Sequence, residues 1–241
     1  MANFMIFDTL DELSFNAAET FIELANEAVD RHGRFVVALS GGSTPRRMFE
    51  LLAESKNMNR VPWDRTFIFW GDDRAVPPDH EWSNYRMARE ALLSHVSIPD
   101  ANIYRILGER GAEQAALVMQ GDMVRVFGEE PLPQFDLVLQ GMGSDGHTAS
   151  LFPGTKALDA TGWVVPVIKP PANPAVDRVT MTFPLLNNAR TALFLVAGKD
   201  KQAVMDEILN DPTADERYPA ARINAQSTLW YLDKEAFKNA D

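Results

Sequence analysis

Apolar residues recur along this chain at two spacings, and the spacing changes at glycines and prolines. Over residues 9–32 they recur every three to four positions, Thr9 and Glu12 form a capping box, and Gly33 follows, which predicts a long first helix. Similar spacing predicts helices at 44–52, 83–96, 112–127 and 201–209. Short runs rich in branched or aromatic residues predict strands at 35–39, 66–70, 136–139, 163–167, 179–183, 190–197 and 228–232.

The order of these elements predicts the fold class. Helices alternate with short buried strands, which is typical of a Rossmann-like α/β fold: a doubly wound, mostly parallel sheet with helices on both faces. The chain contains no internal repeat, low-complexity tract or linker, and its 241 residues suffice for one large α/β domain. We therefore expect residues 1–241 to form a single domain.

The amino-acid composition limits the classes of partner and of chemical site that we expect. The net charge of −11, from 23 Lys+Arg and 34 Asp+Glu, disfavours nucleic acid and anionic membranes as partners, so any anionic ligand must be held by a few placed groups. The absence of cysteine excludes disulfides, thiolate metal sites and a cysteine nucleophile. The first residues lack the features of a signal peptide and no apolar run reaches membrane length, so we expect a cytoplasmic protein. The composition leaves the oligomeric state open.

A glycine-rich turn follows the predicted strand at 35–39. Its sequence, SGGSTP at 40–45, leads into a predicted helix with Thr44 suited to the N-cap and Pro45 to the first helical position. Free backbone N–H groups and the positive end of the helix dipole would meet there, which favours a phosphate. The alternative is an ordinary strand-to-helix loop with good capping residues.

Charged residues follow two other predicted strands. Asp72, Asp73 and Arg74 come directly after the strand at 66–70, where ligands bind in open α/β sheets. Lys201 lies in the first turn of a predicted helix, a position that the helix dipole disfavours for a cation unless an anion is near. The alternatives are a solvated loop with a local ion pair and a lysine that points into water.

The stretch 136–154 presents an imidazole. A predicted strand ends at Gly141 and Gly143, and Asp145 and His147 then share a glycine-lined turn. The alternative is a sheet-to-helix connection in which the histidine only caps or is solvated. Because all these loops follow strands of one predicted sheet, we expect them to meet at one edge. His147 is the single histidine among them, which favours a general base over a histidine metal cluster.

Three blocks of sequence follow one another along the chain: SGGSTP at 40–45, WGDDRAVP at 70–77 with Ser83-Asn84, and GMGSDGHTASLFP at 141–153. They resemble the signature blocks of the 6-phosphogluconolactonase family. The wider superfamily includes glucosamine-6-phosphate deaminase and ribose-5-phosphate isomerase and shares a Rossmann-like sheet with a sugar-phosphate site. The resemblance implies hydrolysis of a phosphorylated sugar lactone, without a cofactor or a metal.

Carried over by position, the resemblance assigns roles to eleven residues. His147 is expected to activate water, with Asp145 shaping its turn, and either Arg74 or loop amides to stabilise the oxyanion. Asp72 and Arg74 would line the sugar pocket. The expected substrate-binding residues are Gly41, Gly42, Ser43, Thr44, Asp72, Lys169, Arg178 and Lys201. Of these, Gly42, Ser43 and Thr44 with Lys201 and either Arg178 or Lys169 would hold the phosphate.

The sequence departs from the family pattern at two places. Asp73 stands where the family usually has glutamate, and a longer insert than usual separates Lys169 from Arg178. The nearest alternative enzyme is a glucosamine-6-phosphate deaminase/isomerase, which carries a glutamate immediately before the proline where this chain has Phe152. Loss of that carboxylate favours lactone hydrolysis, which needs fewer acid/base groups. A non-catalytic sugar-phosphate-binding protein on the same fold is the alternative from another class.

Overall fold

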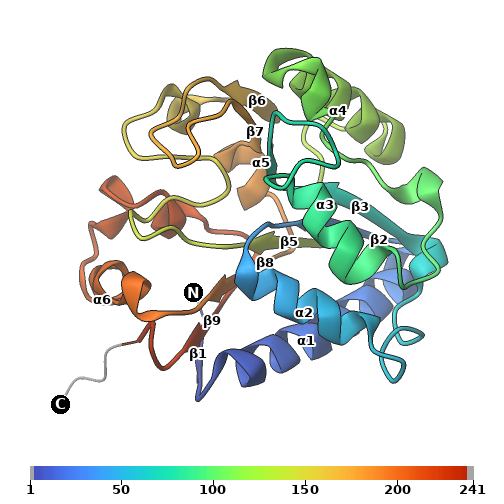
Figure 1. Cartoon of the computed structure of the whole chain (residues 1–241), viewed down its shortest axis with the longest axis horizontal. Helices are drawn as coiled ribbons and strands as arrows, with labels where there is room; N and C mark the ends of the chain where they lie inside the picture. The colour runs from blue at the N-terminus through green and yellow to red at the C-terminus, as the bar shows by residue number, and fades with distance from the viewer. Residues whose placement is uncertain (1–2, 238–241) are drawn as a thin grey trace.

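A six-stranded sheet forms the centre of the computed structural model, which describes residues 3–237 (Figure 1). Its strand order is β1-β9-β8-β5-β2-β3, and each pair of neighbours is parallel. These strands are β1 (Asn3–Phe7), β2 (Phe35–Leu39), β3 (Thr66–Trp70), β5 (Leu137–Gln140), β8 (Thr191–Val196) and β9 (Ser227–Asp233). The prediction of a Rossmann-like, mostly parallel α/β fold is confirmed.

A second, three-stranded sheet is antiparallel. It pairs β4 (Asp72–Arg74) with β7 (Arg178–Met181) and β7 with β6 (Val164–Val167). Gly71 joins the two sheets, because its N–H donates to the Leu39 carbonyl at 2.8 Å and its carbonyl accepts from the Met181 N–H at 2.8 Å. The chain therefore leaves the parallel sheet at Gly71 and carries Asp72 and Arg74 into the small sheet, which the sequence patterns did not predict.

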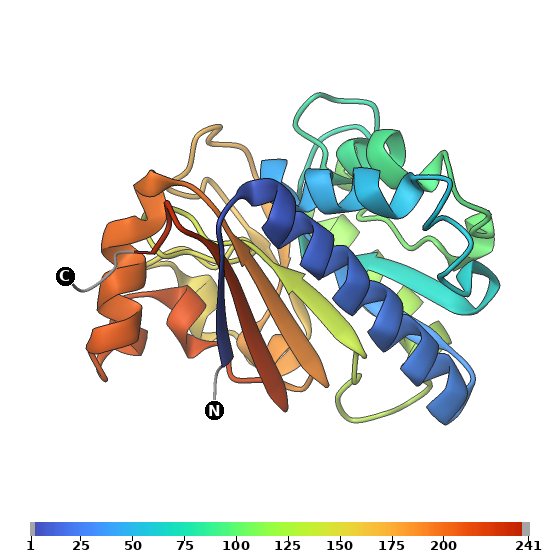
Figure 2. The same cartoon turned by 90° about the horizontal axis from the view of Figure 1, so that it is seen from below.

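Helices pack on both faces of the central sheet. Figure 1 shows α1 and α2 on one side and α4 with the small sheet on the other, and Figure 2 shows α1 running across the sheet. The helices are α1 (Leu10–His32), α2 (Ser43–Ala53), α3 (Asn84–Ala88), α4 (Ala112–Phe127), α5 (Phe183–Asn187) and α6 (Gln202–Asn210).

Local chemistry sets the ends of α1. Thr9 Oγ1 accepts from the Glu12 N–H at 3.1 Å, and Glu12 Oε2 accepts from the Asp8 N–H at 2.9 Å, so both side chains satisfy N–H groups at the helix start. Gly33 ends the helix with φ +83°, a left-handed conformation that favours glycine. The predicted caps of this helix are confirmed.

The burial of each strand explains whether it could be predicted from the sequence pattern. Every residue of β2 and β8, which lie inside the parallel sheet, is buried, so both read as continuous apolar runs. β1 lies at the edge, and four of its five residues are exposed. We did not predict β1, because its apolar residues follow no core-facing pattern.

Several predicted boundaries were wrong. Helix α2 begins at Ser43 with Gly42 as its N-cap, not at Pro45 after Thr44, because Gly42 adopts φ +109° and turns the chain two residues earlier. The strand predicted at 179–183 ends at Met181, since Phe183 and Pro184 open α5. The helix predicted at 83–96 comprises α3 and a π-helical segment, Arg89–Leu93. Turns and an isolated bridge follow His147, so the sheet-to-helix alternative was wrong.

Candidate active site

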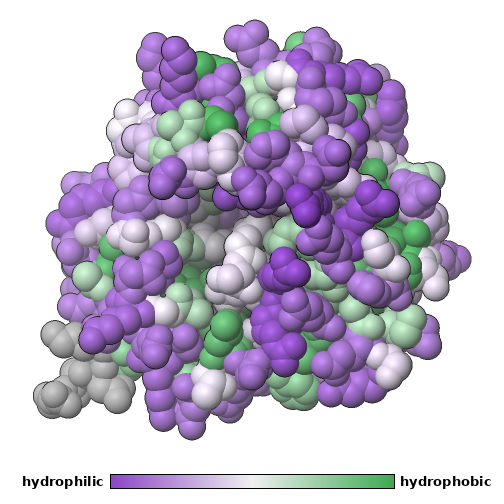
Figure 3. All heavy atoms as spheres, in the orientation of Figure 1, coloured by the Kyte–Doolittle hydropathy of each residue, from purple (hydrophilic) through white to green (hydrophobic). Residues whose placement is uncertain are grey.

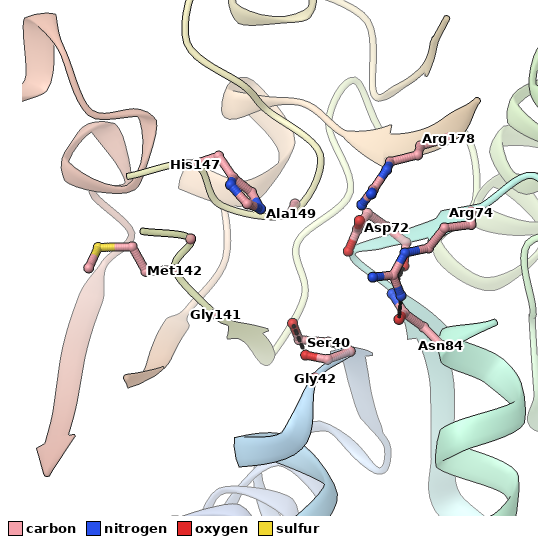
Figure 4. A pocket seen from close by; sticks show the side chains of 12 residues that line it. Ser40, Gly42, Asp72, Arg74, Asn84, Gly141, Met142, His147, Ala149 and Arg178 are labelled. Atoms are coloured by element: carbon pink, nitrogen blue, oxygen red, sulfur yellow. Dashed lines mark hydrogen bonds between the residues drawn. The ribbon is translucent and has the colours of Figure 1, made fainter. Parts of the chain in front are cut away.

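A cavity of about 250 Å³ opens at the carboxyl ends of β2 and β5, beside the small sheet. The face seen in Figure 3 is hollowed near its middle and is mostly hydrophilic around the hollow. Figure 4 shows His147 on one side of the cavity and Asp72, Arg74 and Arg178 on the other. The lining comes from five separate segments: Ser40, Gly41, Gly42, Asp72, Arg74, Asn84, Gly141, Met142, Gly143, His147, Ala149 and Arg178.

A tight turn holds His147. The Gly143 N–H donates to the His147 carbonyl at 2.9 Å, and Asp145 Oδ1 accepts from the His147 N–H at 3.1 Å. The same Oδ1 lies 2.5 Å from His147 Nδ1. A carboxylate at that nitrogen favours the Nδ1–H tautomer, which leaves a lone pair on Nε2. His147 thus has the arrangement of a general base, with Asp145 orienting it.

Asp145 keeps its negative charge beside the imidazole. Partial burial pushes the pKa of its carboxyl upward, but the hydrogen bond and the charge of His147 outweigh burial and leave that pKa below its ordinary value. A charged carboxylate in this place would stabilise positive charge on the neighbouring ring.

Phe152 is a buried residue whose ring contacts side chains on both sides of the site. Its ring centroid lies 4.4 Å from that of His147, and the Arg178 guanidinium carbon lies 5.3 Å from the same centroid. Phe152 is 1% exposed, so it cannot move without repacking the core.

The turn requires glycine at position 143. A Cβ built there would lie 2.1 Å from His147 Nδ1 and 2.5 Å from Asp145 Oδ1. Both are movable side-chain atoms, so the Gly143→Ala protein should fold but its imidazole should be displaced. We expect its turnover in the expected lactone hydrolysis to fall about 100-fold. Steady-state kinetics with a thermal melt checks this. Gly121→Ala on α4 is the control, since apart from its chain neighbours and the backbone of its own helix no atom lies within 4 Å of its Cβ. Equal turnover in both variants would contradict the prediction.

Arg178 brings a buried positive charge to the cavity. The residue is 4% exposed, and its Nε has no hydrogen-bond partner within residues 3–237. Burial lowers its pKa from the ordinary value, nearby Asp72 opposes this shift, and Arg74 adds to it. Asp72 in turn accepts from Ser150 Oγ at 2.5 Å. A buried cation with an unused donor is suited to bind an anionic group of a ligand.

Arg74 faces the same cavity and is held by Asn84. Its Nη1 donates to the Asn84 Oδ1 and, at 3.1 Å, to the Trp82 carbonyl. Asn84 Nδ2 donates to the Asp72 carbonyl at 2.9 Å. Sequence reasoning missed Asn84 as a lining residue, although Ser83-Asn84 belonged to the second signature block.

Asp73 lies between Asp72 and Arg74 in the chain but does not line the cavity, and burial raises the pKa of its carboxyl. It is 2% exposed, and burial outweighs the N–H groups of Asn84, Tyr85 and Arg74, which oppose the rise; the charge of Asp72 adds to it. The resulting pKa is about 6, against an ordinary 3.8. The folded protein thus binds a proton near pH 6 that the unfolded chain binds only near pH 3.8.

This difference predicts a pH dependence of stability. As the pH falls from 7 to 4, the free energy of unfolding of the unaltered protein should rise relative to that of Asp73→Asn, by up to about 3 kcal/mol, because asparagine cannot titrate. Urea denaturation of both proteins at several pH values measures the difference. A difference that stays constant over this range would contradict the raised pKa.

The structure brings together part of the predicted site. Gly41, Gly42, Asp72, Arg74, His147 and Arg178 all line the cavity, and Asp145 contacts His147. The predicted Ser43, Thr44, Lys169 and Lys201 are not among its lining residues. Lys201 Nζ lies 2.7 Å from Asp200 Oδ2, and Lys169 is exposed, with its N–H donating to Asp177. The roles of all these residues stay predictions.

Residues 3–237 contain no group of three or more histidine, aspartate or glutamate side chains arranged to hold a metal ion. No helix in this part of the chain is long and apolar enough to cross a membrane.

The fold and the cavity define an α/β protein whose site lies at the carboxyl ends of parallel strands. The family model described as "Glucosamine-6-phosphate isomerases/6-phosphogluconolactonase" matches residues 8–230, and the chain belongs to this family.

Individual relatives agree with this membership. The chain is 42% identical over 217 residues to a 6-phosphogluconolactonase of Synechocystis sp., with 88% of each chain covered. The chain is also similar to the crystal structure of 6-phosphogluconolactonase from Thermotoga maritima. The sequence identity is 30% and the TM-score is 0.84, with 97% of this chain and 100% of that one covered. A monomeric glucosamine-6-phosphate deaminase has a TM-score of 0.79 over 97% of this chain and 98% of its own, but at 20% identity it shares only the fold.

Proposed function

We propose that this protein is a 6-phosphogluconolactonase, which hydrolyses 6-phospho-D-glucono-1,5-lactone to 6-phospho-D-gluconate in the oxidative pentose phosphate pathway. The observation that carries the proposal is the pairing of Asp145 with His147 Nδ1, opposite two arginines in one cavity. This arrangement combines a general base with cations that suit a phosphorylated substrate. The curated relatives named 6-phosphogluconolactonase support the choice of substrate.

His147 acts on water in the first step. Nε2 takes a proton from the water molecule while the water oxygen bonds to the acyl carbon of the lactone. Arg74 or loop amides stabilise the oxyanion that forms. In the second step the bond from the acyl carbon to the ring oxygen breaks, and that oxygen takes the proton from His147. A lactone is an activated ester, so a covalent nucleophile is not required.

The phosphate binds in the part of the cavity between Arg178 and the start of α2. Gly42 is the N-cap of α2 and supplies no side-chain cap, so N–H groups of the first turn are free to bind an anion. Ser43 and Thr44 lie in this turn. Lys201 binds the phosphate when it exchanges its contact with Asp200 for one with the ligand. Lys169 is the alternative to Arg178 as the main cation beside Lys201.

One assay tests this function. Acid release from freshly made 6-phosphogluconolactone is followed against spontaneous hydrolysis, with and without a chelator. We expect catalysed release that the chelator leaves unchanged. Ammonia release from glucosamine 6-phosphate at a comparable rate would instead support the deaminase, and binding of 6-phosphogluconate without hydrolysis would support a sugar-phosphate-binding protein. We further propose that the chain is one domain and acts in the cytoplasm.

A further inference from the structure

Asp73 lies one residue from two cavity-lining residues but does not line the cavity. Successive side chains of a strand point to opposite sides, so in β4 (Asp72–Arg74) the outer two face the cavity and Asp73 faces α3. A carboxylate that is 2% exposed is costly unless its oxygens are satisfied.

Four donors converge on this carboxylate. Oδ1 accepts from the N–H groups of Asn84 at 2.7 Å and Arg74 at 2.8 Å. Oδ2 accepts from the Tyr85 N–H at 3.1 Å and from Ser83 Oγ at 3.2 Å. Asp73 therefore binds the start of α3 to β4 at the point where Asn84 enters the cavity wall.

Asn84 passes this constraint on to Arg74. Both ends of its amide are used, Oδ1 by the Arg74 guanidinium and Nδ2 by the Asp72 carbonyl (Figure 4). The opposite wall confines it too, because a Cβ at Gly41 would lie 1.9 Å from Asn84 Oδ1. With Nη1 held in this way, the Arg74 guanidinium has one orientation, and its buried Nε has no partner within residues 3–237.

We propose that Asp73 is a positioning residue for the reaction: through the N–H and side chain of Asn84 it fixes the guanidinium of Arg74 toward the reacting carbonyl of the lactone. This inference rests on the proposed function for its substrate. The chain of contacts itself, from Asp73 to Asn84 to Arg74, is a property of the protein without ligand.

A double-mutant cycle tests the route through Arg74. Asp73→Asn keeps the size of the side chain but replaces one acceptor oxygen with a donor, and we expect kcat/KM to fall about 10- to 100-fold. In an Arg74→Met background the same change should cost about two-fold or less, because the group that it positions is gone. Asp73→Glu, which keeps the carboxylate, should recover most of the loss.

The control is a buried carboxylate at the start of β5 in the central sheet, away from the cavity. Asp136 is 5% exposed and accepts from the Val36 N–H at 2.9 Å, with His32 Nε2 also at 2.9 Å. Asp136→Asn should lower stability and leave the turnover of the folded protein unchanged. A loss in Asp73→Asn that persists in full in the Arg74→Met background would overturn the proposal.

A second readout needs no turnover. In the unaltered protein the buried Arg74 Nε–H should exchange slowly with solvent, and in Asp73→Asn it should exchange faster, as followed by NMR of the guanidinium. Unchanged exchange would overturn the positioning role even if the protein hydrolysed no lactone. An active unaltered protein with an unaffected Asp73→Asn variant would overturn the inference but leave the proposed function in place.

Discussion

Replacement of His147 by alanine is expected to lower kcat for 6-phosphogluconolactone about 10²- to 10⁴-fold, the usual contribution of a general base. The Asp145 contact at Nδ1 leaves Nε2 to accept the proton of water, and alanine removes that acceptor. The proposed phosphate contacts lie on other segments, so the affinity for 6-phosphogluconate should change little. Initial rates corrected for spontaneous hydrolysis, together with calorimetric titration of 6-phosphogluconate, measure both effects.

His95→Ala is the matched control for this experiment. The His95 ring contacts the Glu90 carbonyl at 2.9 Å, and His95 does not line the cavity. We expect the control to hydrolyse the lactone at the unaltered rate. Near-normal turnover of His147→Ala would remove this residue as the base, and a parallel loss of 6-phosphogluconate affinity would indicate a binding role instead.

Replacement of Arg74 by methionine is expected to lower kcat about 10²- to 10³-fold, the cost of losing one oxyanion donor. Arg74 faces His147 across the cavity, and Asn84 holds one of its nitrogen atoms while Nε is buried without a partner in the described chain. Methionine preserves much of the packing and removes the donors. A full kcat and KM comparison distinguishes stabilisation of the transition state from binding of the ground state.

Arg86→Met provides a control on α3, the short helix that also carries Asn84. Arg86 pairs with Glu90 at 2.7 Å and its side chain is 42% exposed, so its removal should leave hydrolysis unchanged. If Arg74→Met raised KM with kcat unchanged, Arg74 would be a binding residue and loop amides would be the better candidates for the oxyanion contact.

Most of the fold could be predicted from local patterns. The caps at Thr9 and Gly33 and the fully buried runs of β2 and β8 are properties of neighbouring residues, and they appear in the structure as expected. The edge strand β1 could not be predicted in this way. Its exposed apolar residues gain their structure from pairing with β9, which lies more than 200 residues away in the chain.

In the candidate site, too, some features could be predicted from neighbouring residues and others depend on distant segments. Glycine turns after strands indicated where a ligand binds, and His147 with Asp145 could be chosen because their turn is local. The sequence did not reveal that Asn84 lines the cavity or that the Phe152 ring contacts both His147 and Arg178. Both features depend on segments that meet only in space. Nor did it reveal that Lys201 contacts Asp200 and does not line the cavity.

The chain's own order of residues thus determined the class of fold and the ends of several elements, and it pointed to His147 as the candidate base, because each follows from contacts over a few positions. The folded arrangement settled which cations reach the cavity. Arg178 does so because β7 pairs antiparallel with β4, opposite Arg74, and burial leaves its guanidinium facing the site. Strand pairing and burial are long-range effects, and no local spacing encodes them.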